Sequence, residues 1–157
     1  MNLSLRTAIG KDAAFCESLS RANMAVYHRA RGIDWDPQRF QASWLQFENL
    51  MVLAGGEVVG LLRLLAEGDA LAIRDLQLLP GQQGRGIGSW AVERAKALAR
   101  ERGFHRVVLR VYADNPARNL YLRRGFVVEA TVDDTLHMAC PLDLADSTPP
   151  VSTKELR

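Results

Sequence analysis

The stretch LAIRDLQLLPGQQGRGIG, residues 71–88, joins two different sequence patterns. Its first part is apolar enough to predict a strand, and Pro80 ends that strand. From Gly86 to Arg102 the apolar residues recur at helical spacing, which predicts a helix with one apolar face. The first N–H groups of a helix have no internal acceptor and carry the positive end of the helix dipole. A glycine-rich turn at this point therefore predicts an anion-binding site.

Two common phosphate-binding motifs do not fit this turn. A P-loop requires lysine where Ile87 stands. A Rossmann fingerprint requires glycine or alanine where Ser89 stands, and its first strand normally begins the domain, whereas about 70 residues precede this one. A glycine-rich connector that binds no ligand remains an alternative on the evidence of the turn alone.

Outward from this stretch, the patterns predict the order β-α-α-β-β-β-α-β-α-β-β. The expected strands are 3–7, 51–54, 58–65, 71–79, 106–112, 126–129 and 135–140, and the expected helices are 11–31, 37–45, 86–102 and 116–125. Asp36 is placed to cap the second helix, with Pro37 at its first position, and Phe40, Trp44 and Leu45 are expected on one face. The fold class is α+β, a mixed sheet flanked by helices. An antiparallel meander precedes one right-handed β-α-β crossover, which pairs its two strands in parallel.

The length and composition indicate one globular domain. With 157 residues, of which 48% are hydrophobic, the chain fits a single domain over 1–142, followed by a polar tail over 143–157 that we expect to be flexible. No signal peptide and no apolar run of membrane-spanning length is found, so we expect a cytoplasmic protein that does not enter a membrane. Cys16 and Cys140 lack metal-binding spacing, so we expect no metal and two buried thiols.

The charge is distributed unevenly along the chain. Residues 81–125 hold ten lysines and arginines against three acidic residues, whereas the remainder holds ten basic and fifteen acidic residues. A basic half suits an anionic ligand. We do not expect nucleic acid as that ligand, because the basic residues lie on helical segments without interleaved stacking aromatics. Arginine-rich exposed helices with no ligand would give the same count.

Two motifs together resemble the GCN5-related N-acetyltransferase (GNAT) family. Residues 83–88, QGRGIG, fit its Q/R-x-x-G-x-G/A signature, and 76–80 resemble the central strand and the turn that follows it. Residues 115–126, NPARNLYLRRGF, resemble the second half of the family's coenzyme site, with the alanine displaced to Ala117. The resemblance covers about residues 71–128. It implies the GNAT fold, in which the strands at 71–79 and 106–112 splay apart.

The resemblance also implies where acetyl-coenzyme A binds. The amides of the glycine turn would hold its pyrophosphate, and the pantetheine arm would lie in the gap between the splayed strands. The backbone N–H of Leu78 would stabilise the oxyanion. Arg85 would contact a phosphate or point into solvent. The coenzyme-binding residues implied in this way are Leu76, Gln77, Leu78, Gln83, Gly84, Arg85, Gly86, Ile87, Gly88, Ser89, Asn115 and Arg118.

Tyr121 and Asn115 lie on the same predicted helix, and each has two interpretations. In the family a tyrosine at the position of Tyr121 points at the coenzyme sulfur, so it would act as general acid to the departing thiolate. The alternative is a core tyrosine packed under the sheet. Asn115 would contact the coenzyme, cap the helix, or do both.

The general base and the acceptor site are the least determined features. Ala72 stands where histone-acetylating members carry a glutamate, and the face on which Asp75 lies depends on whether a bulge interrupts the strand. The remaining candidates for the base are His28, Asp36, Glu129, His137 and water. We expect the acceptor near Tyr27, His28, Trp35 and Asp75, where aromatic faces, together with Asp34 and Asp36, could hold a cationic amine. Ordinary helix packing is the alternative.

The resulting hypothesis is an N-acetyltransferase. It would move an acetyl group from acetyl-CoA to a primary amine, on a small molecule or a peptide, by direct attack in a ternary complex. Two alternatives stay open: an acyltransferase that uses another acyl-CoA donor, and a non-catalytic acyl-CoA-binding regulatory module. Dimers are common in the family, so the resemblance allows a homodimer.

Overall fold

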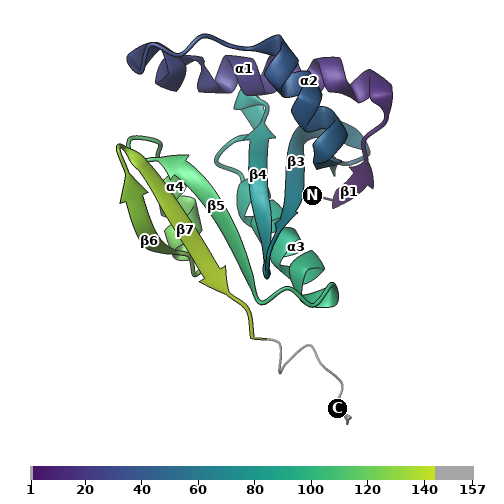
Figure 1. Ribbon diagram of the computed structural model, residues 1–157. Helices are drawn as coiled ribbons and strands as arrows, with labels where there is room; N and C mark the ends of the chain where they lie inside the picture. Colours follow the sequence, from purple (N-terminus) through teal and green to yellow (C-terminus); the bar gives the residue numbers. More distant parts are fainter. Residues whose placement is uncertain (1, 144–157) are drawn as a thin grey trace.

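A seven-stranded mixed sheet forms the centre of the protein in a computed structural model that describes residues 2–143 (Figure 1). The strands lie in the order β1-β2-β3-β4-β5-β7-β6. The strands are β1 (Leu3–Thr7), β2 (Glu48–Ala54), β3 (Glu57–Glu67), β4 (Ala70–Leu78), β5 (Arg106–Tyr112), β6 (Val127–Val132) and β7 (Thr135–Pro141). The helices are α1 (Ala13–Ala30), α2 (Pro37–Gln46), α3 (Ile87–Glu101) and α4 (Ala117–Arg123), with short 3-10 turns η1 (Gly10–Asp12) and η2 (Pro80–Gln82).

The predicted fold class and element order are confirmed. Strands β1 to β4 form an antiparallel run, and β4 pairs in parallel with β5 across the α3 crossover. Strands β2 and β6 are longer than expected, because pairing with β3 and β7 extends them. All of the predicted tail beyond Asp143 lies outside the described residues.

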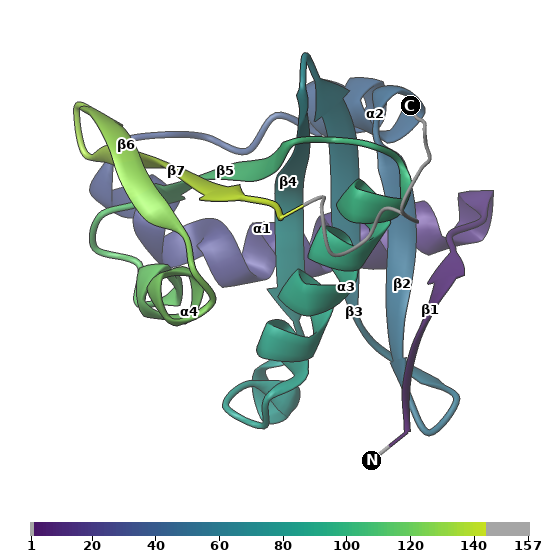
Figure 2. The same cartoon turned by 90° about the horizontal axis from the view of Figure 1, so that it is seen from below.

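The helices cover the sheet from both sides. Helices α1 and α2 lie on one face and α3 and α4 on the other, as the view from below shows (Figure 2). One core, which includes Leu62, Leu71 and Val107, fills the space between the sheet and α3 and α4. A smaller core, which includes Cys16 and Phe40, lies under α1 and α2. No helix among residues 2–143 is long and apolar enough to cross a membrane.

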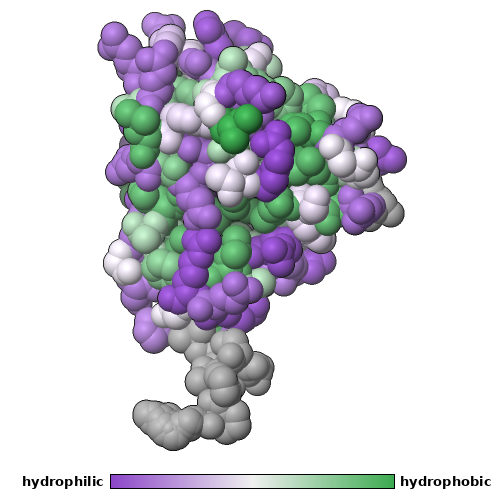
Figure 3. All heavy atoms as spheres, turned by 90° about the vertical axis from the view of Figure 1, so that its right-hand side faces the viewer, coloured by the Kyte–Doolittle hydropathy of each residue, from purple (hydrophilic) through white to green (hydrophobic). Residues whose placement is uncertain are grey.

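Helices α2 and α3 form where their sequence signals lie. The Asp36 carboxylate accepts hydrogen bonds from two backbone N–H groups of the first turn of α2, as expected of an N-cap. Of the apolar face predicted for α3, Ile87, Ala91, Ala95 and Ala99 are buried and Leu98 is partly buried. The expectation for Leu45 is wrong: Phe40 and Trp44 stack on each other, but Leu45 is 89% exposed. On the face that carries β1, apolar and polar side chains are interleaved (Figure 3).

Strands β4 and β5 separate part-way along their length. Their parallel pairing runs from Ala70 with Arg106 to Ile73 with Leu109 and then ends. Beyond it the two ribbons diverge (Figure 1). The second half of β4 therefore has no strand partner on the β5 side, and the backbone groups on that side are left for another ligand.

A bulge in β4 lies at the point of separation. Arg63 of β3 pairs with Asp75 but the next residue, Leu64, pairs with Ile73, so Arg74 is an extra residue. The extra residue turns Asp75 to the face that carries α1, whereas Ile73 lies in the core under α3. The bulge thus settles which way Asp75 faces.

Gly60 of β3 lies against the separated part of β4. A methyl group at this position would come 2.3 Å from the carbonyl oxygen of Gln77 and 2.6 Å from Leu78 Cδ2. We predict that Gly60→Ala lowers the free energy of unfolding by about 1–3 kcal/mol in denaturant titrations, because the backbone must shift to relieve the overlap. Gly10→Ala is the control, since nothing lies within 4 Å of its added methyl group. Equal stability of the two variants would contradict the close packing of β3 on β4.

Candidate functional site

A cleft of about 1130 Å³ opens where β4 and β5 diverge. It is bordered by α1, the second half of β4, the glycine turn, the start of α3, the end of β5 and α4. The cleft thus brings together the two sequence motifs, which are more than 25 residues apart in the chain. The open space, the turn and the short helix form one continuous surface.

The glycine turn presents free N–H groups to the cleft. Gly84 and Gly86 have φ values of +74° and +84°, which glycine adopts without strain. The first helical bond of α3 runs from Trp90 N to Gly86 O, at 3.0 Å. Within residues 2–143, the N–H groups of Ile87, Gly88 and Ser89 have no acceptor. Three donors at the positive end of the helix dipole are the arrangement that binds phosphate.

The backbone of β4 also presents donors to the cleft. Leu79 N donates to Val59 O of β3 at 2.9 Å. Because antiparallel pairing alternates, the N–H groups of Leu76 and Leu78 point the other way, into the gap beside β5. The carbonyl of Leu78 faces that way too, where it accepts from Asn23 Nδ2 at 2.9 Å. An extended ligand in the gap could therefore pair with β4 like an added strand.

Helix α4 contributes a protonated phenol. Tyr121 is 8% exposed, lines the cleft and contacts Phe126 edge-on, so it belongs to the core and to the site at once. Burial, and to a smaller extent the negative charge of Asp75, raise the pKa of its hydroxyl well above the ordinary value. Tyr121 therefore stays protonated and able to donate. At the start of α4, Asn115 Oδ1 accepts from Ala117 N at 2.9 Å, and Asn115 also lines the cleft.

The carboxylate of Asp75 is held by three donors on the α1 side of the cleft. It accepts hydrogen bonds from Ser20 Oγ at 2.7 Å, from Gln77 Nε2 at 3.0 Å and from Arg63 Nη1 at 3.4 Å. Arg63 is 3% exposed and lies over the ring of Phe40. Burial lowers the pKa of its guanidinium, and the negative charge of Asp75 opposes that shift. The pair ties β3, β4 and α1 together beside the site.

Four aromatic rings form one wall of the cleft, which we call the aromatic wall. Tyr27 stacks on Tyr112 with ring centroids 6.2 Å apart. The ring of His28 packs against Trp35 and Tyr112, with centroid distances of 6.1 and 6.5 Å. All four residues line the cleft. This wall can accept a ligand with an apolar or aromatic body.

The sequence model of the acetyltransferase (GNAT) family matches residues 13–126. The chain belongs to this family. No curated protein matches the chain.

Solved structures of N-acetyltransferases share the GNAT fold. The PaiA N-acetyltransferase of Thermoplasma acidophilum, in complex with coenzyme A, is 17% identical, covers 90% of this chain and 99% of its own, and has a TM-score of 0.72. The spermidine N-acetyltransferase of Vibrio cholerae, in complex with CoA and spermine, is 20% identical, covers 88% and 95%, and has a TM-score of 0.72. The ribosomal-protein-S18-alanine N-acetyltransferase of Escherichia coli is 18% identical, covers 90% and 95%, and has a TM-score of 0.70. At these identities the likeness is one of fold.

The cleft of this GNAT chain gathers most of the predicted coenzyme residues. Those that line it are Leu76, Gln77, Leu78, Gln83, Gly84, Gly86, Gly88, Ser89 and Asn115. Three others do not line it. The side chain of Ile87 is fully buried, Arg85 donates to Gln82 Oε1 at 3.1 Å, and Arg118 is exposed on α4. The coenzyme contacts assigned to all twelve residues stay predictions.

Some of the candidates for the acceptor site and the general base line the same cleft, and others lie outside it. Tyr27, His28, Trp35 and Asp75 all line it. Asp36 is engaged as a helix cap, Glu129 pairs with Arg106 at 3.0 Å, and His137 lies in a separate groove. Arg63, Tyr112 and Arg123 also line the cleft, and no motif in the sequence predicts them as site residues. Arg63 is the single charged residue within the apolar part of β3, between the glutamates at its two ends, and a charge at such a position indicates a buried, paired group.

We predict that Gly86→Val raises the dissociation constant of coenzyme A at least about tenfold in calorimetry. The side chain would strain a left-handed residue and stand where the anion approaches the N–H groups. Gly103→Val is the matched control: this glycine has a φ of +80°, an open surrounding, and lies just after the other end of α3. Gly103→Val carries the same backbone strain as Gly86→Val, but its side chain does not stand where the anion would approach. Equal affinities of the two variants would contradict the assignment of the turn.

We predict that Asp75→Asn lowers the free energy of unfolding by about 2–4 kcal/mol, because Arg63 would keep a buried charge without its counter-charge. Glu67→Gln is the control. Its pair with Arg74, at 3.1 Å, is about a third exposed on both sides, so we expect a change below about 1 kcal/mol. Urea titration of both variants and of the parent protein measures the two changes in the free energy of unfolding. A small effect of Asp75→Asn would show that the pair does not hold β3, β4 and α1 together.

Proposed function

We propose that this GNAT chain transfers an acetyl group from acetyl-CoA to a primary amine while both substrates are bound. One observation carries the proposal: Gly88 and Ser89, whose N–H groups are free at the start of α3, line one cleft together with Leu78 and the protonated Tyr121. These are a donor set for a pyrophosphate, a donor for an oxyanion and an acid for a leaving group. The T. acidophilum and V. cholerae proteins of the same fold were solved with coenzyme A.

The coenzyme is proposed to lie along the gap between β4 and β5. Its pyrophosphate accepts from the N–H groups of residues 87–89, and its pantetheine arm pairs with the free edge of β4. This places the thioester between Leu78 and Tyr121. The aromatic wall of Tyr27, Trp35 and Tyr112 is then left for the acceptor.

The chemical step is nucleophilic attack by the amine nitrogen on the thioester carbonyl carbon. The carbonyl oxygen becomes an oxyanion, to which Leu78 N–H donates. When the carbon–sulfur bond breaks, the Tyr121 hydroxyl gives its proton to the thiolate. The nitrogen gives up one proton, which returns through water to the phenolate. The products are an N-acetyl amide and free coenzyme A.

An acceptor that arrives as an ammonium group must first lose one proton to become the neutral nucleophile, and His28 is the candidate that accepts this first proton. His28 lines the cleft, and no hydrogen-bond partner for its ring lies within residues 2–143. Asp75 is less suited, because Ser20, Gln77 and Arg63 already donate to its carboxylate. We assign to Asp75 the positioning of α1 against β4.

We predict that Tyr121→Phe lowers kcat for release of free thiol from acetyl-CoA by about 10²-fold or more, while the affinity for coenzyme A stays within about twofold. The ring and its contact with Phe126 are retained, so the loss reports on the hydroxyl. Tyr112→Phe is the control on the other side of the cleft, where we expect a change below about threefold, since Tyr112 contributes its ring.

A panel of amines with acetyl-CoA is the corresponding test of the activity itself. Tight coenzyme binding without thiol release on any amine would overturn the proposal in favour of a binding module. An unchanged kcat in Tyr121→Phe would remove this residue from the mechanism.

A further inference from the structure

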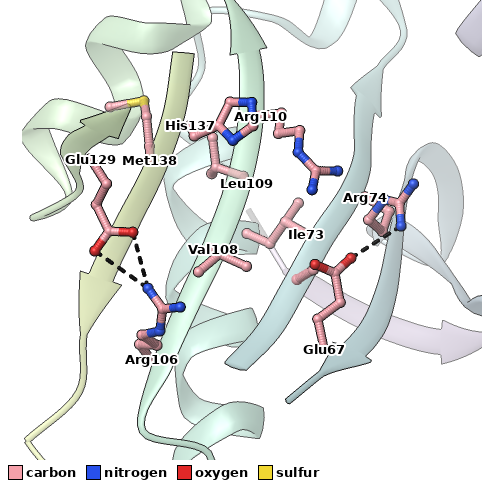
Figure 4. A pocket seen from close by; sticks show the side chains of 11 residues that line it. Glu67, Ile73, Arg74, Arg106, Val108, Leu109, Arg110, Glu129, His137 and Met138 are labelled. Atoms are coloured by element: carbon pink, nitrogen blue, oxygen red, sulfur yellow. Dashed lines mark hydrogen bonds and ion pairs between the residues drawn. The ribbon is translucent and has the colours of Figure 1, made fainter. Parts of the chain in front are cut away.

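A second, smaller cavity of about 210 Å³ lies beside the cleft. Arg106, Val108 and Arg110 line it from the face of β5 opposite to the core under α3. Side chains of β3, β4, β5, β6 and β7 form it (Figure 4). It shares Ile73, Arg74, Leu109 and Arg110 with the main cleft. Ile73 and Leu109 are the last pair before the strands separate, so the two spaces meet at the fork. We call this smaller cavity the sheet groove.

The carboxylates of the sheet groove are neutralised by arginines. Glu67 pairs with Arg74 at 3.1 Å, and Glu129 pairs with Arg106 at 3.0 Å. These pairs lie on opposite rims of the sheet groove (Figure 4). An added ammonium group would have to displace an arginine from either one. The sheet groove therefore disfavours a cationic ligand.

Arg110 lies between these pairs without a partner. Within residues 2–143, it takes part in no ion pair and no hydrogen bond to another side chain. Figure 4 shows its guanidinium reaching from β5 over the gap toward Arg74 on β4. His137 stands directly opposite it on β7 and points into the same space. The lining of the sheet groove holds three arginines and two glutamates, and Arg106 also pairs with Asp69, outside the lining, at 3.3 Å. Arg110 is the arginine of this lining that no carboxylate pairs with in the described part of the chain.

Strand irregularities on both sides direct charged residues into this space. Arg74 is the extra residue of the bulge in β4, and Glu129 is skipped by the register shift between Val128 and Ala130 in β6. Both side chains reach the rim of the sheet groove. Bulges re-aim side chains beside active sites more often than elsewhere. Each rim of the sheet groove thus carries a charged residue from a bulge, and Arg110 lies unpaired between the two rims.

We propose that Arg110, with His137 beside it, binds a carboxylate of the acceptor, so that the acceptor is a small amine that also carries a carboxylate. A guanidinium offers paired N–H donors that match the two oxygens of a carboxylate. The amine end reaches the thioester through the fork, and the aromatic wall receives the body of the molecule. The inference rests on the proposed function, and it replaces the expectation that Asp34 and Asp36 hold a cationic amine, since neither lines the cleft.

The test uses two amines of nearly the same shape, of which one carries a carboxylate and the other a neutral amide: 4-(aminomethyl)benzoate and 4-(aminomethyl)benzamide. Calorimetry measures their binding to the protein saturated with coenzyme A. We expect the carboxylate to bind about tenfold or more tightly than the amide, the gain that a charge-assisted hydrogen bond gives. A second pair, 5-aminopentanoate and 5-aminopentanamide, tests whether the preference holds without the aromatic ring. Equal affinities within both pairs would overturn the inference.

Arg110→Gln tests whether Arg110 causes the tighter binding of the acid. We expect the variant to bind acid and amide with similar affinity while its coenzyme affinity and melting temperature stay as in the parent, because Arg110 is exposed and unpaired. Arg94→Gln, on the exposed face of α3, is the control and should keep the preference. A preference that survives in Arg110→Gln would overturn the role of Arg110.

Thiol release with the same amines separates this inference from the proposed function. Acid-selective binding without thiol release would refute acetyl transfer to these amines and leave the carboxylate site standing. Thiol release at equal rates and affinities for acid and amide would refute the carboxylate site and leave acetyl transfer standing.

Discussion

The end of the parallel pairing between β4 and β5 is the constraint on which the site depends. After Ile73 and Leu109 the strands part, and each loses hydrogen bonds that a continuous ladder would supply. Such an opening persists only if other contacts hold both strands in place. If β4 and β5 stayed paired along their whole length, the N–H groups of Leu76 and Leu78 would donate to carbonyls of β5 and could not bind a ligand. The cleft and the unpaired edge of β4 both follow from this separation.

Helix α1 acts as the spacer that keeps the strands apart. Ser20 and Asn23 hold the second half of β4 through hydrogen bonds of 2.7 and 2.9 Å. Just past the end of the helix, Arg31 pairs with Asp114 in the loop after β5 at 2.8 Å and lies 3.8 Å from the ring centre of Tyr112. At 1.5 Å per residue, the helix spans about 12 Å between Asn23 and Arg31. Figure 1 shows α1 crossing above both strands.

Local sequence signals predicted the elements but not the contacts that turn them into a site. The glycine turn, the Asp36 cap and the stripe on α3 depend on neighbours along the chain, so the element order followed from them. The direction of Asp75 depends on a bulge, and a bulge is decided by the register between β3 and β4. That Arg110 is unpaired could not be predicted either, because its neighbours Glu67 and Glu129 are taken by other arginines through tertiary contacts.

Amide hydrogen exchange with and without coenzyme A tests the central claim, that the backbone donors of the fork bind the coenzyme. The account predicts that coenzyme A slows exchange at Leu76, Leu78 and residues 87–89 at least about tenfold, because each N–H gains an acceptor. Exchange at β6, on the far edge of the sheet, should not change. Unchanged exchange at Leu78 and at residues 87–89 in the saturated protein would contradict the account.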